Sequence, residues 1–159
     1  MMRDIKSFIR NKRGTAAIEF GAVGGLLALT MLSVVDIGRL ALCIMQTNYG
    51  VETGTLYAAN NGFDVTAISQ VVQSAAKSNG ITATPSPYMF CGCPIDSGVQ
   101  EMSRTTTASS CSSATCTNAG GMTAQGAYVK VQAQSSFSAL FNVMPYPRDI
   151  TAAAVVRIQ

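Results

Sequence analysis

The stretch Arg13–Phe20, with the sequence RGTAAIEF, decides the organisation of this chain. It joins a basic tail to a long apolar run, and it places one carboxylate, Glu19, in the first turns of that run. A charge next to lipid is costly and needs a partner. The segment behind it, residues 20–35, has no charged residue. The pattern therefore predicts an apolar membrane helix that begins directly after a basic leader.

The chain then divides into three parts. We expect a basic leader over residues 1–14, a transmembrane stem helix over residues 15–60 and an exported head over residues 61–159. The segment from Phe20 to Arg39 corresponds to about 30 Å of helix, which is enough to cross the hydrocarbon of a bilayer. Inner-membrane lipid is therefore an expected partner.

The net charge belongs to the leader. Residues 1–14 hold five bases and one acid (+4), residues 15–45 hold one base and two acids (−1), and the rest holds five of each. Charged residues make up only 12% of the chain, against about a quarter in an ordinary soluble domain. A nucleic-acid-binding domain needs a basic face on its folded part, so nucleic acid is not an expected partner.

The bases of the leader place the N-terminus in the cytoplasm by the positive-inside rule, so the head is exported. An ordinary signal peptide has a shorter apolar region that is followed by its cleavage site. Here the break at Gly14 precedes the apolar run. Two alternatives stay open: cleavage after Gly14, which leaves the helix on the mature protein, or an uncleaved signal anchor.

Gly14, Glu19 and Phe20 resemble the processing site of class-III-type prepilins, in particular that of the TadE-like pseudopilins of Flp/Tad pilus systems. That pattern is a basic leader, Gly, cleavage, and an apolar helix with Glu at the fifth mature position followed by an aromatic residue. The segment Asp36–Arg39 also looks like the end of a TadE-like stem. The resemblance covers residues 10–60 well and the last thirty residues more loosely.

The resemblance implies a pilin-like fold and cleavage between Gly14 and Thr15 by a prepilin peptidase. It implies a single-pass protein of the bacterial inner membrane with a periplasmic head, and it allows incorporation into an extracellular pilus. The implied partners are other pilin or pseudopilin subunits and the assembly platform. Cleavage would expose the α-amine of Thr15, which can neutralise Glu19 within one chain or between neighbours. The family favours the version between subunits, in which Glu19 guides docking.

Other stem residues suggest packing and anchoring. Ala17, Gly21 and Gly25 recur every four residues, a spacing that lets membrane helices approach closely. Asp36 and Arg39 are spaced i, i+3, so they can pair as anchors at the periplasmic interface.

The helix is expected to continue beyond the membrane. A helical stripe follows, and it consists of Leu42, Met45, Tyr49 and Leu56. Gly50 and Gly54 are weak points at which the helix can bend. The segment Asn60–Gly62 is the expected stop.

The head is predicted to be α+β, with a second helix and a small antiparallel sheet packed on the stem helix. Asp64 or Thr66 caps the second helix, and Ser78–Gly80 ends it. Thr84–Pro87 is an extended connector. The remaining expectations are strands at 88–91 and 98–102, a loop at 103–121, an alternating strand at 127–137, a short apolar turn or helix at 139–143 and a last strand at 150–158.

Four of the five cysteines suggest covalent cross-links. Cys43 lies in the stem and is expected to be a small buried residue. The pairs Cys91/Cys93 and Cys111/Cys116 could hold zinc or form disulfides. An oxidising compartment favours two disulfides. A bridge within Cys91-Gly92-Cys93 would be strained, so cross-pairing is preferred, with its connectivity open.

The sequence predicts a structural assembly subunit and no enzymatic activity. Histidine is absent, which removes Ser-His and Cys-His catalysis and His-ligated metal. No cofactor or metal is expected. The acids of the head are scattered and form no motif; they are Asp64, Asp96, Glu101 and Asp149. The alternative function is an uncleaved, membrane-anchored binding or adhesion module that uses the loop at 103–121.

Overall fold

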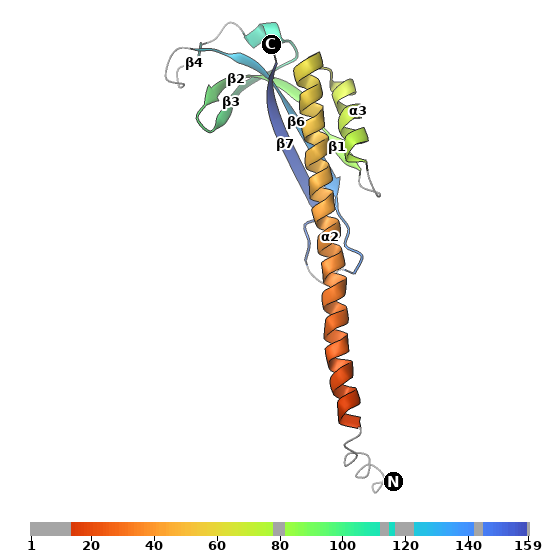
Figure 1. Ribbon diagram of the computed structural model, residues 1–159. Coiled ribbons are helices and arrows are strands. Elements are labelled where there is room, and N and C mark those ends of the chain that lie inside the picture. Colours follow the sequence, from red (N-terminus) through yellow and green to blue (C-terminus); the bar gives the residue numbers. More distant parts are fainter. Residues whose placement is uncertain (1–13, 78–81, 112–114, 117–122, 142–144, 159) are drawn as a thin grey trace. The chain divides into compact units, whose positions relative to one another are not determined.

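The computed structural model describes residues 14–77, 82–111, 115–116, 123–141 and 145–158. This part of the chain is α+β, with a long apolar N-terminal helix, a second helix and a small antiparallel sheet, as predicted (Figure 1). The helices are α2 (Thr15–Asn61) and α3 (Val65–Ala76). The main sheet contains β1 (Ala83–Pro85), β2 (Tyr88–Ile95), β3 (Gly98–Thr105), β6 (Gly126–Ser136) and β7 (Asp149–Ile158). The 3₁₀ helix η2 (Ala108–Cys111) and the small strand pair β4 (Thr115–Cys116) and β5 (Thr123–Ala124) complete the elements.

The chain forms two compact units, which are described separately. The stem unit consists, in its described part, of residues 14–39, 139–141 and 145–146. The head unit consists of residues 40–77, 82–111, 115–116, 123–138 and 147–158. The outer part of α2, from Leu40 onward, thus belongs to the head unit and packs with its sheet and second helix.

Helix α2 ends where the sequence predicts. Its last residue is Asn61, and Gly62 follows with a φ of +83°. The N–H of Gly62 donates to the carbonyl of Ala58 at 3.0 Å. A glycine in the left-handed region at this position is a common helix C-cap, because it has no Cβ to clash.

Helix α3 begins at a side-chain cap. The Oδ1 of Asp64 accepts hydrogen bonds from the N–H groups of Thr66 at 2.8 Å and Ala67 at 3.0 Å. These bonds satisfy two of the donors that a helix start leaves open. The helix ends at Ala76, and the predicted stop at 78–80 lies outside the described residues.

The face of α2 that packs in the head unit consists mostly of small residues. They are Cys43, Thr47, Gly50, Val51, Gly54, Thr55 and Ala58. A Cβ on Gly50 would lie 2.8 Å from the Cβ of Ala76, and a Cβ on Gly54 would lie 2.4 Å from the Cγ2 of Val72. The two glycines therefore allow α3 to approach α2 closely. Helix α2 runs unbroken through both glycines (Figure 1).

Strand β6 is the centre of the sheet. Strand β7 pairs with it antiparallel from Ala127↔Ile158 to Ser136↔Asp149, while β2 and β1 pair with different stretches of it. The predicted alternation of β6 is confirmed, since Ala127, Val129, Val131 and Ala133 lie in the core. Tyr128, on the opposite face, is also buried, because its ring stacks on Phe90 with centroids 5.7 Å apart.

The other strands are longer than the sequence indicates. Strand β2 continues to Ile95 and β3 to Thr105, with a register shift between Cys91 and Gly92. The predicted connector at Thr84–Pro87 overlaps β1, and the predicted loop at 103–121 contains the end of β3, η2 and β4. The elements β1, η2 and β4 have too few residues for a periodic pattern to show in the sequence.

Candidate functional site

The inner part of α2 presents an exposed apolar surface. Between Ile18 and Val35 most of the large side chains are exposed; the exposed ones include Phe20, Val23, Leu26, Leu27, Leu29, Met31 and Val34. Helix α2 is long and apolar enough to cross a membrane, and only 11% of its most apolar window is buried. A buried core helix would hide these side chains, so the exposure indicates membrane anchoring.

The predicted processing and packing residues lie at the start of this surface. Gly14 precedes α2, Thr15 is its first residue, and Glu19 is exposed in the second turn. Ala17 is exposed, and a Cβ on Gly21 or on Gly25 would meet nothing within 4 Å. Cleavage at Gly14 and helix packing at this face remain predictions.

Asp36 is fully buried, with a relative exposure of 0%. Its Oδ1 accepts a hydrogen bond from the N–H of Leu140 at 2.9 Å, and its Oδ2 accepts one from the N–H of Phe141 at 3.1 Å. These hydrogen bonds give each oxygen of the buried side chain a donor, so they compensate for the burial of a polar group.

These contacts give Asp36 a role that the sequence reasoning missed. We expected an interface anchor that can pair with Arg39, three positions later. Instead the carboxylate binds backbone amides of the segment between β6 and β7, more than a hundred residues later. Arg39 is half-buried on the same helix. The sequence signal was the acid at the end of an apolar run, which requires a partner but does not identify one.

The outer part of α2 carries a second apolar surface, which we call the outer stripe. It consists of Leu42, Met45, Tyr49 and Leu56, with relative exposures of 50, 66, 61 and 60%. The predicted spacing is real, but the residues point away from the side of α2 that packs in the head unit. Large apolar side chains grouped on one exposed face mark an interaction site more often than singly scattered ones do.

The four head cysteines form two disulfides. Cys91 is bonded to Cys111, with a Cα–Cα distance of 5.1 Å, and Cys93 to Cys116, with 5.6 Å. This is the preferred cross-pairing of the first pair with the second. The first bridge fastens η2 to strand β2, and the second fastens β4 to the same strand. Cys43 lies outside both bridges and is buried, as expected.

Two acidic residues of the head, Asp64 and Glu101, have structural partners. Asp64 caps α3, and Glu101 accepts hydrogen bonds from the hydroxyl of Tyr88 at 2.9 Å and the Nε of Arg104 at 3.2 Å. Slight burial opposes ionisation, but these two bonds outweigh it, so the pKa of Glu101 is lowered. The hydrogen bond to Glu101 raises the pKa of Arg104. Both shifts favour the charged forms of an exposed ion pair, which suits a surface contact rather than proton transfer.

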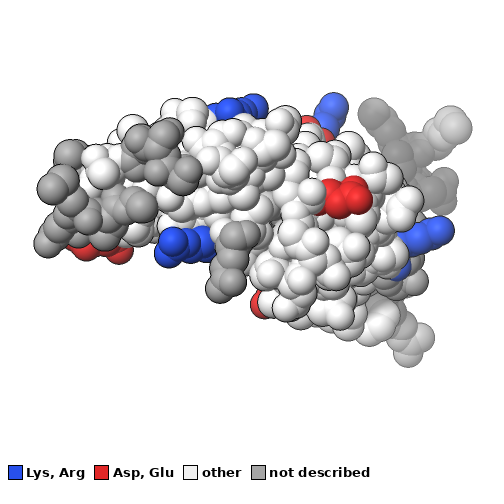
Figure 2. All heavy atoms as spheres, turned by 90° about the horizontal axis from the view of Figure 1, so that it is seen from above, with Lys and Arg blue, Asp and Glu red and all other residues white. Residues whose placement is uncertain are grey.

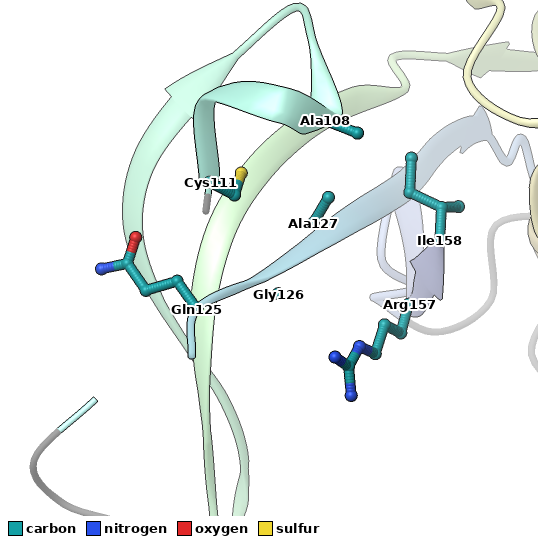
Figure 3. Close-up of a pocket in the computed structure, with 7 residues that line it drawn as sticks. All are labelled: Ala108, Cys111, Gln125, Gly126, Ala127, Arg157 and Ile158. Atoms are coloured by element: carbon teal, nitrogen blue, oxygen red, sulfur yellow. The ribbon is translucent and has the colours of Figure 1, made fainter. Parts of the chain in front are cut away.

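The head unit also has a hollow of about 510 Å³ near the end of β7 (Figure 3). Its lining includes Arg157, Gln125 and Gly126. The described lining combines one cation with one amide and holds no acid, so it offers no acid–base pair for catalysis. On the face shown in Figure 2 the basic side chains lie singly and form no continuous patch.

Comparisons of the chain with protein-family models, with curated proteins and with solved structures found no match. The functional argument therefore depends on the surfaces described above: the inner apolar surface with Glu19, the Asp36 contact, and the outer stripe.

Proposed function

We propose that this chain is a structural assembly subunit, a TadE-like pseudopilin or minor pilin of a Flp/Tad-type pilus or secretion system. In this proposal a prepilin peptidase cleaves after Gly14, and the mature protein is held in the inner membrane by the inner part of α2. The pilin-like reading of the fold is part of the same proposal. It is supported by the combination of a long apolar N-terminal helix with a head that packs on the outer part of that helix.

The observation that carries the proposal is the outer stripe. A helix that only tethers a head needs one apolar surface for lipid and one for the head. Helix α2 has a third, because Met45, Tyr49 and their neighbours are exposed beyond Asp36, past the uncharged run. Burying such side chains against another helix is favourable by roughly 1.5–3 kcal/mol for each large residue. Helix-to-helix packing of subunits would bury them.

Glu19 supports the same function from the other end of the helix. In the proposal, cleavage creates an α-amine at Thr15, four residues before Glu19 in the helix. A carboxylate in lipid is stabilised by an opposite charge. If the amine comes from a neighbouring subunit, this pairing sets the position of one helix against the next.

The alternative is an uncleaved, membrane-anchored periplasmic binding or adhesion module. The hollow near Arg157 favours it, because a concave site with a cation and an amide suits a small anionic ligand. In that case the outer stripe would have no partner subunit to contact.

A single substitution separates the two functions. We expect Tyr49→Lys to reduce incorporation into the assembled system strongly, because it places a charge in the middle of the proposed helix contact. Central aromatic residues of interfaces often contribute about 2 kcal/mol or more, which corresponds to a loss of roughly thirtyfold in association. The measurement is the amount of the chain that co-purifies with assembled pili or with the secretion complex from cells that express it.

The matched control is Asn48→Lys. Asn48 precedes Tyr49 and is also exposed, but it lies to one side of the outer stripe. Both variants keep the face of α2 that packs in the head, so both should reach the membrane in equal amounts. If the Tyr49→Lys protein is incorporated as well as the Asn48→Lys protein, the outer stripe is not an assembly surface.

A further inference from the structure

The segment between β6 and β7 carries two large apolar side chains that the described chain leaves uncovered. Leu140 is 62% exposed and Phe141 is 46% exposed. Their backbone amides are the two donors that bind Asp36, so the backbone of the segment is fixed while the side chains face outward. Both residues belong to the stem unit, together with the apolar part of α2.

Asp36 marks the outer end of the expected membrane span. It is the first charged residue after Glu19, and the sixteen uncharged residues between the two would cover about 24 Å of helix. With the apolar residues before Glu19 the span reaches the roughly 30 Å of a bilayer core. Leu140 and Phe141 therefore lie at the depth where hydrocarbon gives way to head groups on the exported side.

The hydrogen bonds at Asp36 suit this depth. Irregular backbone near hydrocarbon is tolerated only where its N–H groups have partners, since each unsatisfied group costs several kcal/mol. The carboxylate satisfies the amides of Leu140 and Phe141. The same two bonds let the carboxylate itself be buried without water. The two hydrogen bonds thus satisfy polar groups of both the loop and the helix, so both can lie at the edge of the bilayer.

We propose that the segment Ala139–Phe141 is a second membrane contact, in which Leu140 and Phe141 insert into the interfacial region of the exported leaflet beside α2. The occupant of this surface is phospholipid. Aromatic residues favour this zone of the bilayer. Val35 and Ile37, the neighbours of Asp36 in the sequence, are exposed as well, so the apolar surface of the span continues to the level of Asp36.

A second copy of the chain suits this surface less well. A stable interface buries about 800 Å² on each partner, whereas a large aromatic side chain supplies about 150–250 Å². Two side chains therefore fall well short of a protein contact, but they are enough for an interfacial insertion. The proposal requires that α2 spans the membrane, and it is independent of pilus assembly.

Tryptophan is absent from the chain, so one introduced tryptophan is a unique fluorescent probe. The full chain with Phe141→Trp is reconstituted in phosphatidylcholine vesicles whose acyl chains carry bromine either near the head group or near the methyl end. We expect blue-shifted emission and strong quenching, greater with the shallow bromine than with the deep one. Two control probes are Met102→Trp, at an exposed position of β3, which should not be quenched, and Leu27→Trp in the span, which should be quenched by the deep bromine.

A second variant tests the contact with Asp36. Combining Asp36→Ala with Phe141→Trp removes the acceptor of both amides, so quenching should fall toward the Met102→Trp value. Asp36→Asn keeps one acceptor oxygen and should give an intermediate value. Formation of both disulfides confirms that the head has folded in each variant.

Three results would overturn the proposal. The first is a Phe141→Trp probe that emits like Met102→Trp while Leu27→Trp is quenched, since the helix then spans the bilayer and the segment does not touch it. The second is a blue shift that disappears when the chain is diluted to one copy per vesicle, which would assign the surface to a second copy. The third is full quenching in the Asp36→Ala background.

Discussion

Loss of both disulfides is expected to destabilise the head unit by about 5–6 kcal/mol, according to the chain-entropy treatment of cross-links. The bridges Cys91–Cys111 and Cys93–Cys116 span 20 and 23 residues. Each alone would contribute about 3 kcal/mol. A small domain is stable by about 5–15 kcal/mol in total, so removal of both bridges takes away at least about a third of that stability.

The two contributions are not independent. Once Cys91 and Cys111 are joined, the second bridge closes a much shorter loop. This loop runs from Cys93 to Cys91, across the first bridge to Cys111, and on to Cys116. The same treatment then gives it about 2.5 kcal/mol. We therefore expect either single removal, Cys91→Ala/Cys111→Ala or Cys93→Ala/Cys116→Ala, to cost about 2.5 kcal/mol, and the double removal to cost more than twice as much.

The measurement is the free energy of unfolding of the full chain in detergent, from denaturant titration followed by near-ultraviolet circular dichroism. Cys43→Ala is the control, because Cys43 is a buried cysteine outside both bridges and its loss should cost only about 1 kcal/mol of packing. If the protein without either bridge unfolds at the same denaturant concentration as the wild type, the head does not depend on its disulfides.

Gly54→Leu is expected to disrupt the packing of α2 against α3 and the sheet. A Cβ at this position would already lie 2.4 Å from the Cγ2 of Val72 and 3.3 Å from the Cγ1 of Val131. Overpacking of a filled core costs about 1–3 kcal/mol for a small excess of volume, and leucine adds three further carbon atoms. Val72 is fully buried and β-branched, so its side chain has little freedom to move aside.

Two comparisons make this prediction specific. Gly54→Ala should cost about 1–2 kcal/mol, because the gain of roughly 1 kcal/mol in helix propensity offsets part of the clash. Gly38→Ala on the same helix should be neutral or slightly stabilising, since a Cβ there meets nothing within 4 Å. Combining Gly54→Ala with Val72→Ala should cost less than the sum of the two single changes. An additive result would show that the two residues do not touch.

Much of the fold could be predicted from local signals. Asp64 and Gly62 are a helix cap and a helix stop whose chemistry acts within a few residues, and the structure uses both as predicted. The alternation of β6 likewise reports which face is buried, because a strand has only two faces. Such features need no knowledge of distant contacts.

The face of α2 that the head covers could not be predicted in the same way. The outer half of α2 has large apolar residues on one side and mostly small ones on the other. A search for periodic apolar residues detects the side with the larger and more hydrophobic side chains. The large residues, such as Tyr49, form the helical stripe that stands out in the sequence. The structure buries the small side instead, because Gly50 and Gly54 let α3 approach at short distance.

The hydrogen-bond donors to Asp36 could not be predicted from the sequence for another reason. An acid at the end of an apolar helix signals that a partner exists, and Arg39 is near it in sequence. The actual donors are backbone amides at Leu140 and Phe141. Backbone donors are present at almost every residue, so the sequence carries no sign of which ones a carboxylate will bind. The connectivity of the disulfides was open for a comparable reason, since it depends on how the loops fold back on β2.

The central claim, that this chain is a processed subunit rather than a plain anchor, is tested most directly by its mature N-terminus. The protein would be extracted from membranes of cells that contain a prepilin peptidase, and its first residues determined by N-terminal sequencing and intact mass. We predict a chain that begins at Thr15 and lacks residues 1–14. A chain that still begins at Met1 would contradict the proposal and leave the membrane-anchored binding module as the better account.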